Sequence, residues 1–288
     1  MHECRGPLRV LCHISVAPVP ARELIPAAAG AGFDGVSIVA RAHQRFLASE
    51  GLTDADLRAL LTDHGLVVTD FEAVGDWLTP PPTDAPTFLR AVYTEAQCLE
   101  AAAAVGASTL VATHFGEPVP ADQAAPAFAG LCDRAADRGL QVALEFPAMA
   151  TIADVTAAWD VVRLADRPNG GILLDTWHHR RSPGTDAHLA DVPAERVLSI
   201  QLRDGAAEPV GPPVEDVMIS VLPGDGDFGL ADLLRQLDER GVNCPVGIEV
   251  LSREILAQGP VRAAEILYNA LSRVLQEART ESSATPGH

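Results

Sequence analysis

The 288 residues are enough for one large α/β domain, and a content of 48% hydrophobic but only 5% aromatic residues predicts an aliphatic, alanine-rich core. The formal net charge of −18 argues against a nucleic-acid partner, because an acidic surface repels phosphate groups. No apolar run approaches the roughly 20 residues needed to cross a bilayer, so no membrane partner is expected.

The cysteines and the N-terminal residues indicate in which compartment of the cell the protein is expected. The five cysteines lack the spacing of a metal site or a redox motif, which predicts reduced thiols in a cytoplasmic protein: Cys4, Cys12, Cys98, Cys132 and Cys244. Residues 1–9 are polar and are followed by only a short apolar run, unlike a secretory signal. Residues 279–288 are small and polar, so we expect a disordered tail after a domain that spans residues 1–278.

Short apolar runs alternate along the chain with longer amphipathic runs rich in Ala and Leu. The apolar runs predict strands over 9–14, 35–39, 66–72, 108–113, 141–146, 171–175, 197–202 and 246–250. Helices are expected over about 20–30, 53–64, 86–105, 121–138, 152–165, 186–190, 228–240 and 254–277. Strands that are apolar throughout are typical of a parallel sheet covered on both faces. Eight strand–helix units therefore predict a single (β/α)8 TIM barrel.

Local signals agree with these boundaries. Five glycines stand between a helix and the next strand, where a C-cap glycine belongs: Gly32, Gly65, Gly106, Gly139 and Gly241. Thr53 and Thr151 are expected to cap helices. A doubly wound open sheet would also alternate in this way, but no glycine-rich phosphate loop follows the first strand. The prolines between Pro80 and Pro86 follow the third strand and are interpreted as a catalytic-face loop and a candidate lid.

Polar side chains close four consecutive strands in the second half of the chain. They are Glu145, Asp175, Gln201 and Glu249, each in an otherwise apolar run. In this kind of barrel, the carboxyl ends of the strands build the active site. A single polar residue at a strand end often marks only the place where the strand leaves the core, but four in succession point to a shared site.

A divalent metal would explain this convergence of acidic groups. A carboxylate in apolar surroundings is costly unless it is paired or bound to a metal, and no lysine is near. Three carboxylates and one amide oxygen are hard ligands, which suit Mg²⁺ or Mn²⁺, with Co²⁺ as a further candidate. Zinc sites normally contain Cys or His, which this set lacks. We therefore expect one divalent cation bound by the four residues.

Several motifs in the second half of the chain recur in a known superfamily. They are L-E at 144–145, L-L-D-T-W-H at 173–178, I-Q-L-R-D at 200–204, L-P-G-D-G-D-F at 222–228 and G-I-E at 247–249. On these motifs the chain resembles the xylose-isomerase-like barrels, which include sugar phosphate isomerases and epimerases, inosose and 3-dehydroshikimate dehydratases, and endonuclease IV. The resemblance is specific only from about residue 141 to 252. It implies the same four metal ligands, and a substrate oxygen held by His178.

Further polar residues are expected around a substrate. Arg203 stands where the resemblance places a basic residue followed by an acid, and Asp204 is expected to anchor the loop after it. His13, Glu72 and His114 come at or just after the ends of strands one, three and four. Each of these three side chains is interpreted as a candidate substrate contact or as a structural residue of the rim.

The resemblance also implies a reaction type. Family members remove a proton next to a carbonyl through an enediolate, which makes Glu145 and Glu249 acid–base candidates as well as ligands. Return of the proton would make the protein an isomerase or epimerase of a small sugar-like polyhydroxy carbonyl compound. Loss of a β-hydroxyl would make it a dehydratase of the inosose or 3-dehydroshikimate type. A barrel that binds without turnover is a third interpretation, and a homodimer is not excluded.

The chain lacks residues that two branches of this family need, which argues against both activities. Sugar epimerases of this family carry a further Glu and a further Arg six residues after the ligands on strands five and seven, where this chain has Thr151 and Ala207. The nuclease branch needs additional His ligands, and residues 205–220 contain none. The residues therefore predict metal-dependent enolisation without naming the substrate.

Overall fold

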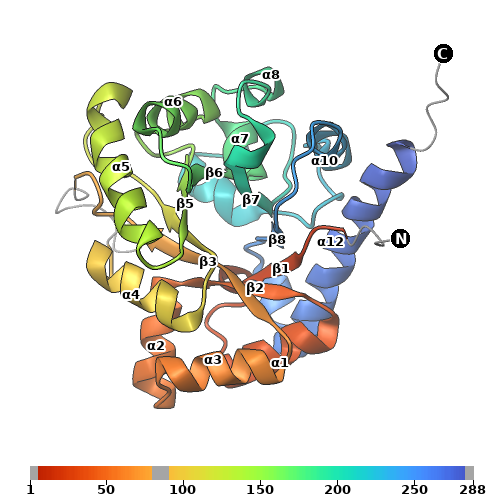
Figure 1. Cartoon of the computed structure of the whole chain (residues 1–288). Helices are drawn as coiled ribbons and strands as arrows, with labels where there is room; N and C mark the ends of the chain where they lie inside the picture. The colour runs from red at the N-terminus through yellow and green to blue at the C-terminus, as the bar shows by residue number, and fades with distance from the viewer. Residues whose placement is uncertain (1–5, 80–90, 283–288) are drawn as a thin grey trace, which may run out of the picture.

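Eight parallel strands close into a barrel in chain order, with β8 hydrogen-bonded to β1 (Figure 1). This computed structural model describes residues 6–79 and 91–282. The strands are β1 Arg9–Cys12, β2 Gly35–Val39, β3 Val67–Val74, β4 Thr109–Ala112, β5 Gln141–Glu145, β6 Gly170–Asp175, β7 Val197–Leu202 and β8 Val246–Ile248. The predicted single (β/α)8 TIM barrel is confirmed.

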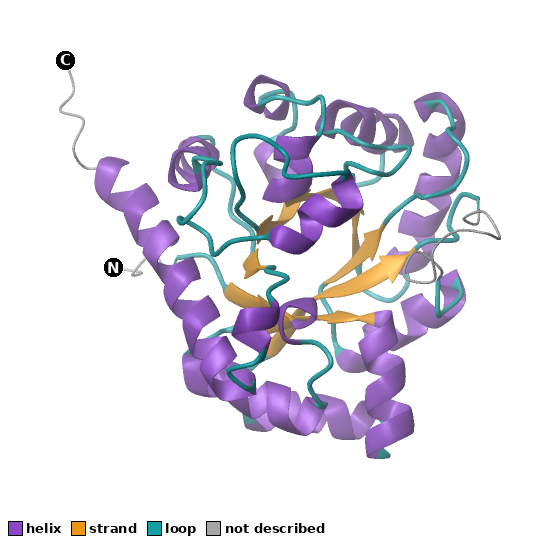
Figure 2. Cartoon of the chain, turned by 180° about the vertical axis from the view of Figure 1, so that it is seen from behind, coloured by secondary structure: helices purple, strands orange, loops and turns teal. Residues whose placement is uncertain are grey.

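The helices lie on the outside of the barrel (Figures 1 and 2). They are α1 Ala21–Ala31, α2 Ala40–Glu50, α3 Asp54–Asp63, α4 Glu95–Val105, α5 Ala121–Ala136, α6 Val155–Ala165, α7 Thr176–Arg181, α8 Asp186–Leu189, α9 Pro213–Asp216, α10 Leu230–Glu239, α11 Arg253–Leu256 and α12 Pro260–Ser282. Short 3₁₀ helices cover His13–Val16 (η1), Ala194–Arg196 (η3) and Val217–Ile219 (η4). The aliphatic core lies between the outer faces of the strands and these helices.

Helix ends follow the expected chemistry with one exception. All five predicted C-cap glycines have a positive φ, which residues with a Cβ rarely adopt. Thr53 forms the predicted capping box with Asp56 at the start of α3. The prediction for Thr151 was wrong, because α6 begins only at Val155 and the side chain of Asp154 caps it through the Ala157 N–H.

Other boundaries differ for local reasons. Strand β1 ends at Cys12, so His13 opens η1 rather than closing a strand, and β8 ends at Ile248, one residue before Glu249. Helix α2 was not predicted, because no capping side chain marks its start at Val39. Helix α12 continues to Ser282, beyond the expected end of the domain at residue 278. The candidate lid at Pro80–Pro86 and residues 283–288 lie outside the described residues.

Cysteine and membrane predictions can be compared with the described part of the chain. Cys12, Cys98, Cys132 and Cys244 are free and buried, as expected for reduced thiols. No helix within residues 6–79 and 91–282 is both long and apolar enough to span a membrane.

Candidate metal centre

The strand register places the four predicted ligands on the inner face of the barrel. Asp175 pairs directly with Gln201 across β6 and β7, and Glu145 pairs with Leu173, two residues before Asp175. Side chains alternate along a strand, so residues two apart share a face. The register of β7 with β8 gives Glu249 the same inward orientation. The four side chains therefore project from neighbouring strands at the carboxyl end of the barrel.

Asp175 divides its two carboxylate oxygens between the fold and the site. Its Oδ1 accepts the backbone N–H of His178 at 2.9 Å and thereby caps α7, which begins at the next residue. Its Oδ2 is buried and makes no hydrogen bond among the described residues. A D-x-x-H sequence thus forms the helix start with one oxygen of the aspartate and turns the other oxygen toward the site.

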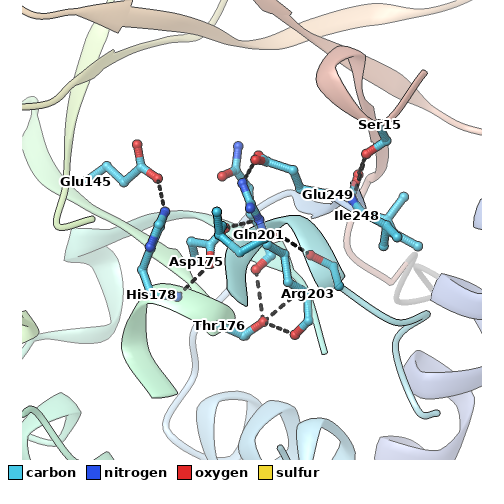
Figure 3. Close-up of polar contacts among 12 residues, drawn as sticks. Ser15, Glu145, Asp175, Thr176, His178, Gln201, Arg203, Ile248 and Glu249 are labelled. Atoms are coloured by element: carbon cyan, nitrogen blue, oxygen red, sulfur yellow. Dashed lines mark hydrogen bonds and ion pairs between the residues drawn. The ribbon is translucent and has the colours of Figure 1, made fainter. Parts of the chain in front are cut away.

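Thr176 ties the end of β6 to the end of β7. Its hydroxyl donates to the Arg203 carbonyl at 2.7 Å and accepts the Arg203 backbone N–H at 2.8 Å (Figure 3). All of these atoms are buried. The bond pair fixes the strand ends that carry Asp175 and Gln201 relative to each other.

We expect the substitution Thr176→Val to lower the free energy of unfolding by about 1–3 kcal/mol, because it keeps the side-chain shape but leaves the Arg203 N–H buried without an acceptor. Thermal or urea unfolding measures this change. Thr62→Val is the matched control, since the Thr62 hydroxyl also bonds to a backbone carbonyl but is exposed. Equal stability of the two variants would contradict the prediction.

Glu145, Asp175 and His178 form a compact cluster, in which one ligand atom from each lies within 4.8 Å of the others. The Nε2 of His178 is 3.6 Å from Glu145 Oε1, and its Nδ1 accepts the backbone N–H of Ala148 at 3.3 Å (Figure 3). Burial lowers the pKa of His178 to about 4, so the ring is neutral near pH 7. With Nδ1 accepting, the single proton lies on Nε2, which makes His178 a donor toward the site.

Arg203 brings the one cation of the described site into the carboxylate group. Its guanidinium pairs with Glu249, and its Nε lies 2.8 Å from Asp175 Oδ2 (Figure 3). The Nε of Arg203 nevertheless has no hydrogen-bond acceptor, so the Asp175 contact is electrostatic only. Arg203, predicted as a substrate contact, thus touches two of the four predicted ligands.

Gln201 and Glu249 are each held by a residue from another part of the barrel. The Gln201 Nε2 donates to Glu72 Oε1 on β3 at 2.9 Å. Ser15 in η1 holds the chain on both sides of Glu249: its hydroxyl donates to the Ile248 carbonyl at 3.2 Å and accepts the Val250 N–H at 2.8 Å. The site therefore draws on β1 and β3 as well as on β5–β8.

The carboxylates of the barrel interior outnumber the nearby cations. Burial, reinforced by neighbouring acids, raises the pKa of Glu145 to about 8 and that of Glu72 to about 7. Asp70 lies two residues before Glu72 on the same strand, and burial raises its pKa to about 6. Without a further cation, these groups ionise only at a cost.

These shifts predict that the three buried acids make the metal-free protein less stable as the pH rises from about 4 to about 8. The lowered pKa values of His178 (about 4) and His13 (about 3) act in the opposite direction and offset part of this loss below about pH 6.5. The three acids keep their protons to a higher pH in the folded than in the unfolded chain, so the folded state is favoured at low pH and this advantage disappears through each folded pKa. Asp70, shifted from 3.8 to about 6, accounts for about 3 kcal/mol.

Melting temperatures in EDTA at pH 5.5 and pH 8.5 measure this effect. The value should be lower at pH 8.5, and saturating divalent metal should remove most of the difference. Asp70→Asn should reduce the difference, because it removes one of the three titrating groups. A higher melting temperature at pH 8.5 in EDTA would contradict the sign.

Comparison with known proteins places the chain in a family. The sequence profile of the xylose isomerase-like TIM barrel family matches residues 25–273. The chain belongs to this family. The family resemblance inferred from the second-half motifs is thereby confirmed, and the match extends through most of the first half as well.

Among relatives of this family, the chain is 29% identical to 3-dehydroshikimate dehydratase of Pseudomonas aeruginosa over 245 residues, which cover 84% of the chain and 37% of that protein. A xylose isomerase-like TIM barrel/4-hydroxyphenylpyruvate dioxygenase fusion protein superposes with a TM-score of 0.84 at 20% identity, covering 99% of the chain and 45% of that protein. The IOLI protein with a bound zinc atom gives 0.82 at 17% identity, covering 94% and 99%. The chain therefore spans little more than a third of its curated relative.

His13 and His114 each contact residues other than the four predicted ligands. His13 is buried beside Arg45, whose Nη2 lies 3.4 Å from its Nε2, and packs edge-on against Phe46. His114 is buried against Trp77, and its Nε2 bonds to the Glu117 carbonyl at 3.0 Å. Neither contacts the predicted ligands through a hydrogen bond or ion pair in the described residues, so their interpretation as substrate contacts stays a prediction.

Asp204 anchors the loop after β7, as expected. Its carboxylate accepts the backbone N–H groups of Gly205, Gly224 and Phe228 at 2.9–3.2 Å. Arg181 fixes the same loop from α7: it pairs with the buried Asp216 at 2.7 Å. The P-G-D-G-D-F segment at 223–228 is therefore fixed to the end of β7 by these hydrogen bonds.

Sequence reasoning missed two residues of this site environment, Asp70 and Ser15. Asp70 stands two residues before Glu72 in β3, and this spacing signals that both side chains face inward. Ser15 gave no signal, because a serine after a strand has many uses. The direct contact of Arg203 with two predicted ligands was also missed, since sequence spacing alone does not show where a long side chain ends.

The donor set fits a divalent cation. Asp175 Oδ2 is a buried oxygen without a hydrogen bond, Glu145 has a raised pKa, and both lie beside further oxygens at one end of the barrel. A cation there would offset the repulsion among these groups. Among the predicted ligands, Glu145 and Asp175 belong to the compact cluster, whereas Glu249 is paired with Arg203 and Gln201 with Glu72.

Proposed function

We propose that the protein is a divalent-metal-dependent enzyme that removes the proton next to the carbonyl of a small sugar-like polyhydroxy compound. The observation that carries this proposal is the buried cluster of Asp175, Glu145 and His178, in which Oδ2 of Asp175 accepts no hydrogen bond among the described residues and is faced by the charge of Arg203. Glu145, Asp175, Gln201 and Glu249 would hold the ion. A bound ion would polarise the substrate carbonyl and acidify the neighbouring C–H bond.

The protein groups around the ion have complementary tasks. Glu145 is the proposed general base, because its pKa of about 8 in the metal-free site marks a carboxyl that accepts a proton readily near neutral pH. The Nε2–H of neutral His178, 3.6 Å from Glu145, would donate to the substrate oxygen on which negative charge develops. Arg203 and Glu249 would orient the substrate from the opposite side.

Return of the proton to carbon would give isomerisation or epimerisation. Epimerisation needs a second base on the other face, for which Glu249 is the candidate. Glu249, however, is paired with the guanidinium of Arg203, whereas Glu145 lies beside the neutral ring of His178 and has a raised pKa. The two glutamates are therefore unequal.

A second candidate function, dehydration, is favoured by that inequality and by the 29% identical 3-dehydroshikimate dehydratase. Elimination needs one base at the α-carbon and one proton donor for the departing hydroxyl. Glu145 could fill both roles from one side of the site, because the proton that it takes from the α-carbon can then pass to the departing hydroxyl, which leaves as water. The Nε2–H of His178 would hydrogen-bond to the substrate oxygen without giving up its proton. Thr151 and Ala207, which depart from the sugar epimerases, support the same candidate.

The choice of ion is part of the proposal. The all-oxygen ligand set suits Mg²⁺ or Mn²⁺, with Co²⁺ also acceptable, while the IOLI neighbour holds zinc. Metal analysis after reconstitution should find about one equivalent per chain. Less than about 0.2 equivalents, with a melting temperature unchanged by chelation, would contradict the metal proposal.

Turnover is tested with 3-dehydroshikimate, an inosose and a ketohexose in D₂O. Deuterium uptake at the α-carbon indicates enolisation, and a product lighter by one water identifies dehydration. Product of unchanged composition indicates isomerisation or epimerisation. Absence of both uptake and water loss from the whole panel would count against catalysis of this type.

A further inference from the structure

We propose that Glu72 is a positioning residue that orients the side-chain amide of Gln201, so that its oxygen rather than its nitrogen faces the metal. The inference rests on the metal site proposed above. It differs from the sequence-based expectation, in which Glu72 was a substrate contact.

The first support is the hydrogen bond itself. Glu72 lies on β3 and Gln201 on β7, which are four strands apart and so face each other across the eight-stranded barrel. The Gln201 Nε2 donates to Glu72 Oε1 at 2.9 Å. Within residues 6–79 and 91–282, no hydrogen bond is donated to the Oε1 of Gln201, which leaves this oxygen free for a ligand role.

A second cross-barrel bond keeps the two strands in place. Two residues earlier on each strand, the Ser199 hydroxyl donates to Asp70 Oδ2 at 3.2 Å, and the same oxygen accepts the Thr69 hydroxyl at 2.8 Å. Ser199 and Asp70 are both buried. Two hydrogen bonds thus join β3 to β7 across the barrel, and they hold Glu72 opposite Gln201.

The chemistry of an amide explains why such a partner is needed. The carboxamide of Gln201 has an oxygen that can bind a cation and an NH₂ group that can only donate. A 180° rotation exchanges them with almost no change in shape. An ionised carboxylate can only accept a hydrogen bond from this NH₂, so Glu72 in its ionised form admits one of the two orientations. His or carboxylate ligands would not need this control in the same way.

The test is the Mn²⁺ affinity of a set of variants, measured by isothermal titration. Glu72→Leu removes the acceptor and should weaken Mn²⁺ binding by about 10- to 100-fold, the usual loss when a partner of a metal ligand is removed. Glu72→Gln keeps the shape of the side chain, but its amide can either accept from or donate to Gln201 and so no longer selects one orientation. Its Mn²⁺ affinity should therefore also fall below that of the wild type.

A second background separates orientation from other effects. In Gln201→Glu both ends of the ligand side chain are oxygens, so no orientation remains to be lost. Glu72→Leu should then change Mn²⁺ affinity by less than about 3-fold. Metal-free melting curves check folding, and Glu72→Leu should be at least as stable as the wild type at pH 8, because it removes a buried acid.

Two results would overturn the inference while leaving the metal proposal intact: wild-type Mn²⁺ affinity in Glu72→Leu, or the same loss for Glu72→Leu with Gln201 and with Gln201→Glu. The first would mean that Glu72 is not needed to orient the amide, and the second that Glu72 acts through charge or packing. A wild-type protein that binds no Mn²⁺ would instead contradict the proposed metal function, and the inference with it.

Discussion

Asp175→Asn should weaken divalent-metal binding by at least about 100-fold while leaving the barrel folded. The Oδ1 of Asp175 caps α7 and its Oδ2 faces the other acids without a hydrogen bond. Asparagine can still cap the helix through its own oxygen, but it replaces the anionic ligand atom with an uncharged group. Losing a ligand should cost at least as much as the 10- to 100-fold loss that follows removal of a ligand's partner.

Asp154→Asn makes the same chemical change at another helix start. Asp154 caps α6 through the Ala157 N–H at 2.8 Å and is not one of the site residues. Its variant should bind Mn²⁺ within about 2-fold of the wild type. Asp175→Ala, which removes the cap as well, should lower the free energy of unfolding by about 1 kcal/mol more than Asp175→Asn. Wild-type Mn²⁺ affinity in Asp175→Asn would show that Asp175 is not a ligand.

Glu145→Gln should lower the rate of proton abstraction by about 10²- to 10⁴-fold, the range attributed to a positioned general base. The glutamine keeps one oxygen for a metal but cannot accept the substrate proton. The effect should therefore fall on kcat at saturating Mn²⁺ and not only on metal affinity. Deuterium uptake from D₂O into a substrate found by the panel above measures the step directly.

Glu100→Gln on α4 serves as the control for Glu145→Gln, because Glu100 is exposed on the outer layer of the barrel. It should leave both uptake and metal affinity unchanged. If Glu145→Gln retained the full rate of uptake at saturating Mn²⁺, another group would have to be the base. Glu249→Gln would then be examined for the same loss.

The fold was predictable because its signals are local and repeated. Strands covered on both faces are apolar at every position, and a positive φ is required at glycines such as Gly32 and Gly106. Helix α2 escaped prediction because its first residue follows Val39, which cannot cap. The cap at Asp154 was misplaced by three residues, since Thr151 is an equally good capping residue and only the path of the preceding loop selects between them.

The sequence allowed us to predict which residues lie near the site, but not which of their side chains contact each other. Polar residues that end apolar parallel strands must meet at one end of a barrel, so Glu145, Asp175 and Gln201 could be grouped from spacing alone. Contacts across the barrel depend on which residues of distant strands reach the same depth. The bond from Gln201 to Glu72 joins residues 129 positions apart, and no local pattern encodes it.

The two cross-barrel bonds between β3 and β7 have a consequence for how such a protein can change over time. The four proposed ligands come from β5–β8, whereas Glu72 belongs to β3 in the first half of the chain. Like Ser15, which holds the chain around Glu249, Glu72 joins the first half to the proposed ligands. If Glu72 orients Gln201 as proposed, a change of residue 72 during divergence would alter the metal site although residue 72 is not a ligand.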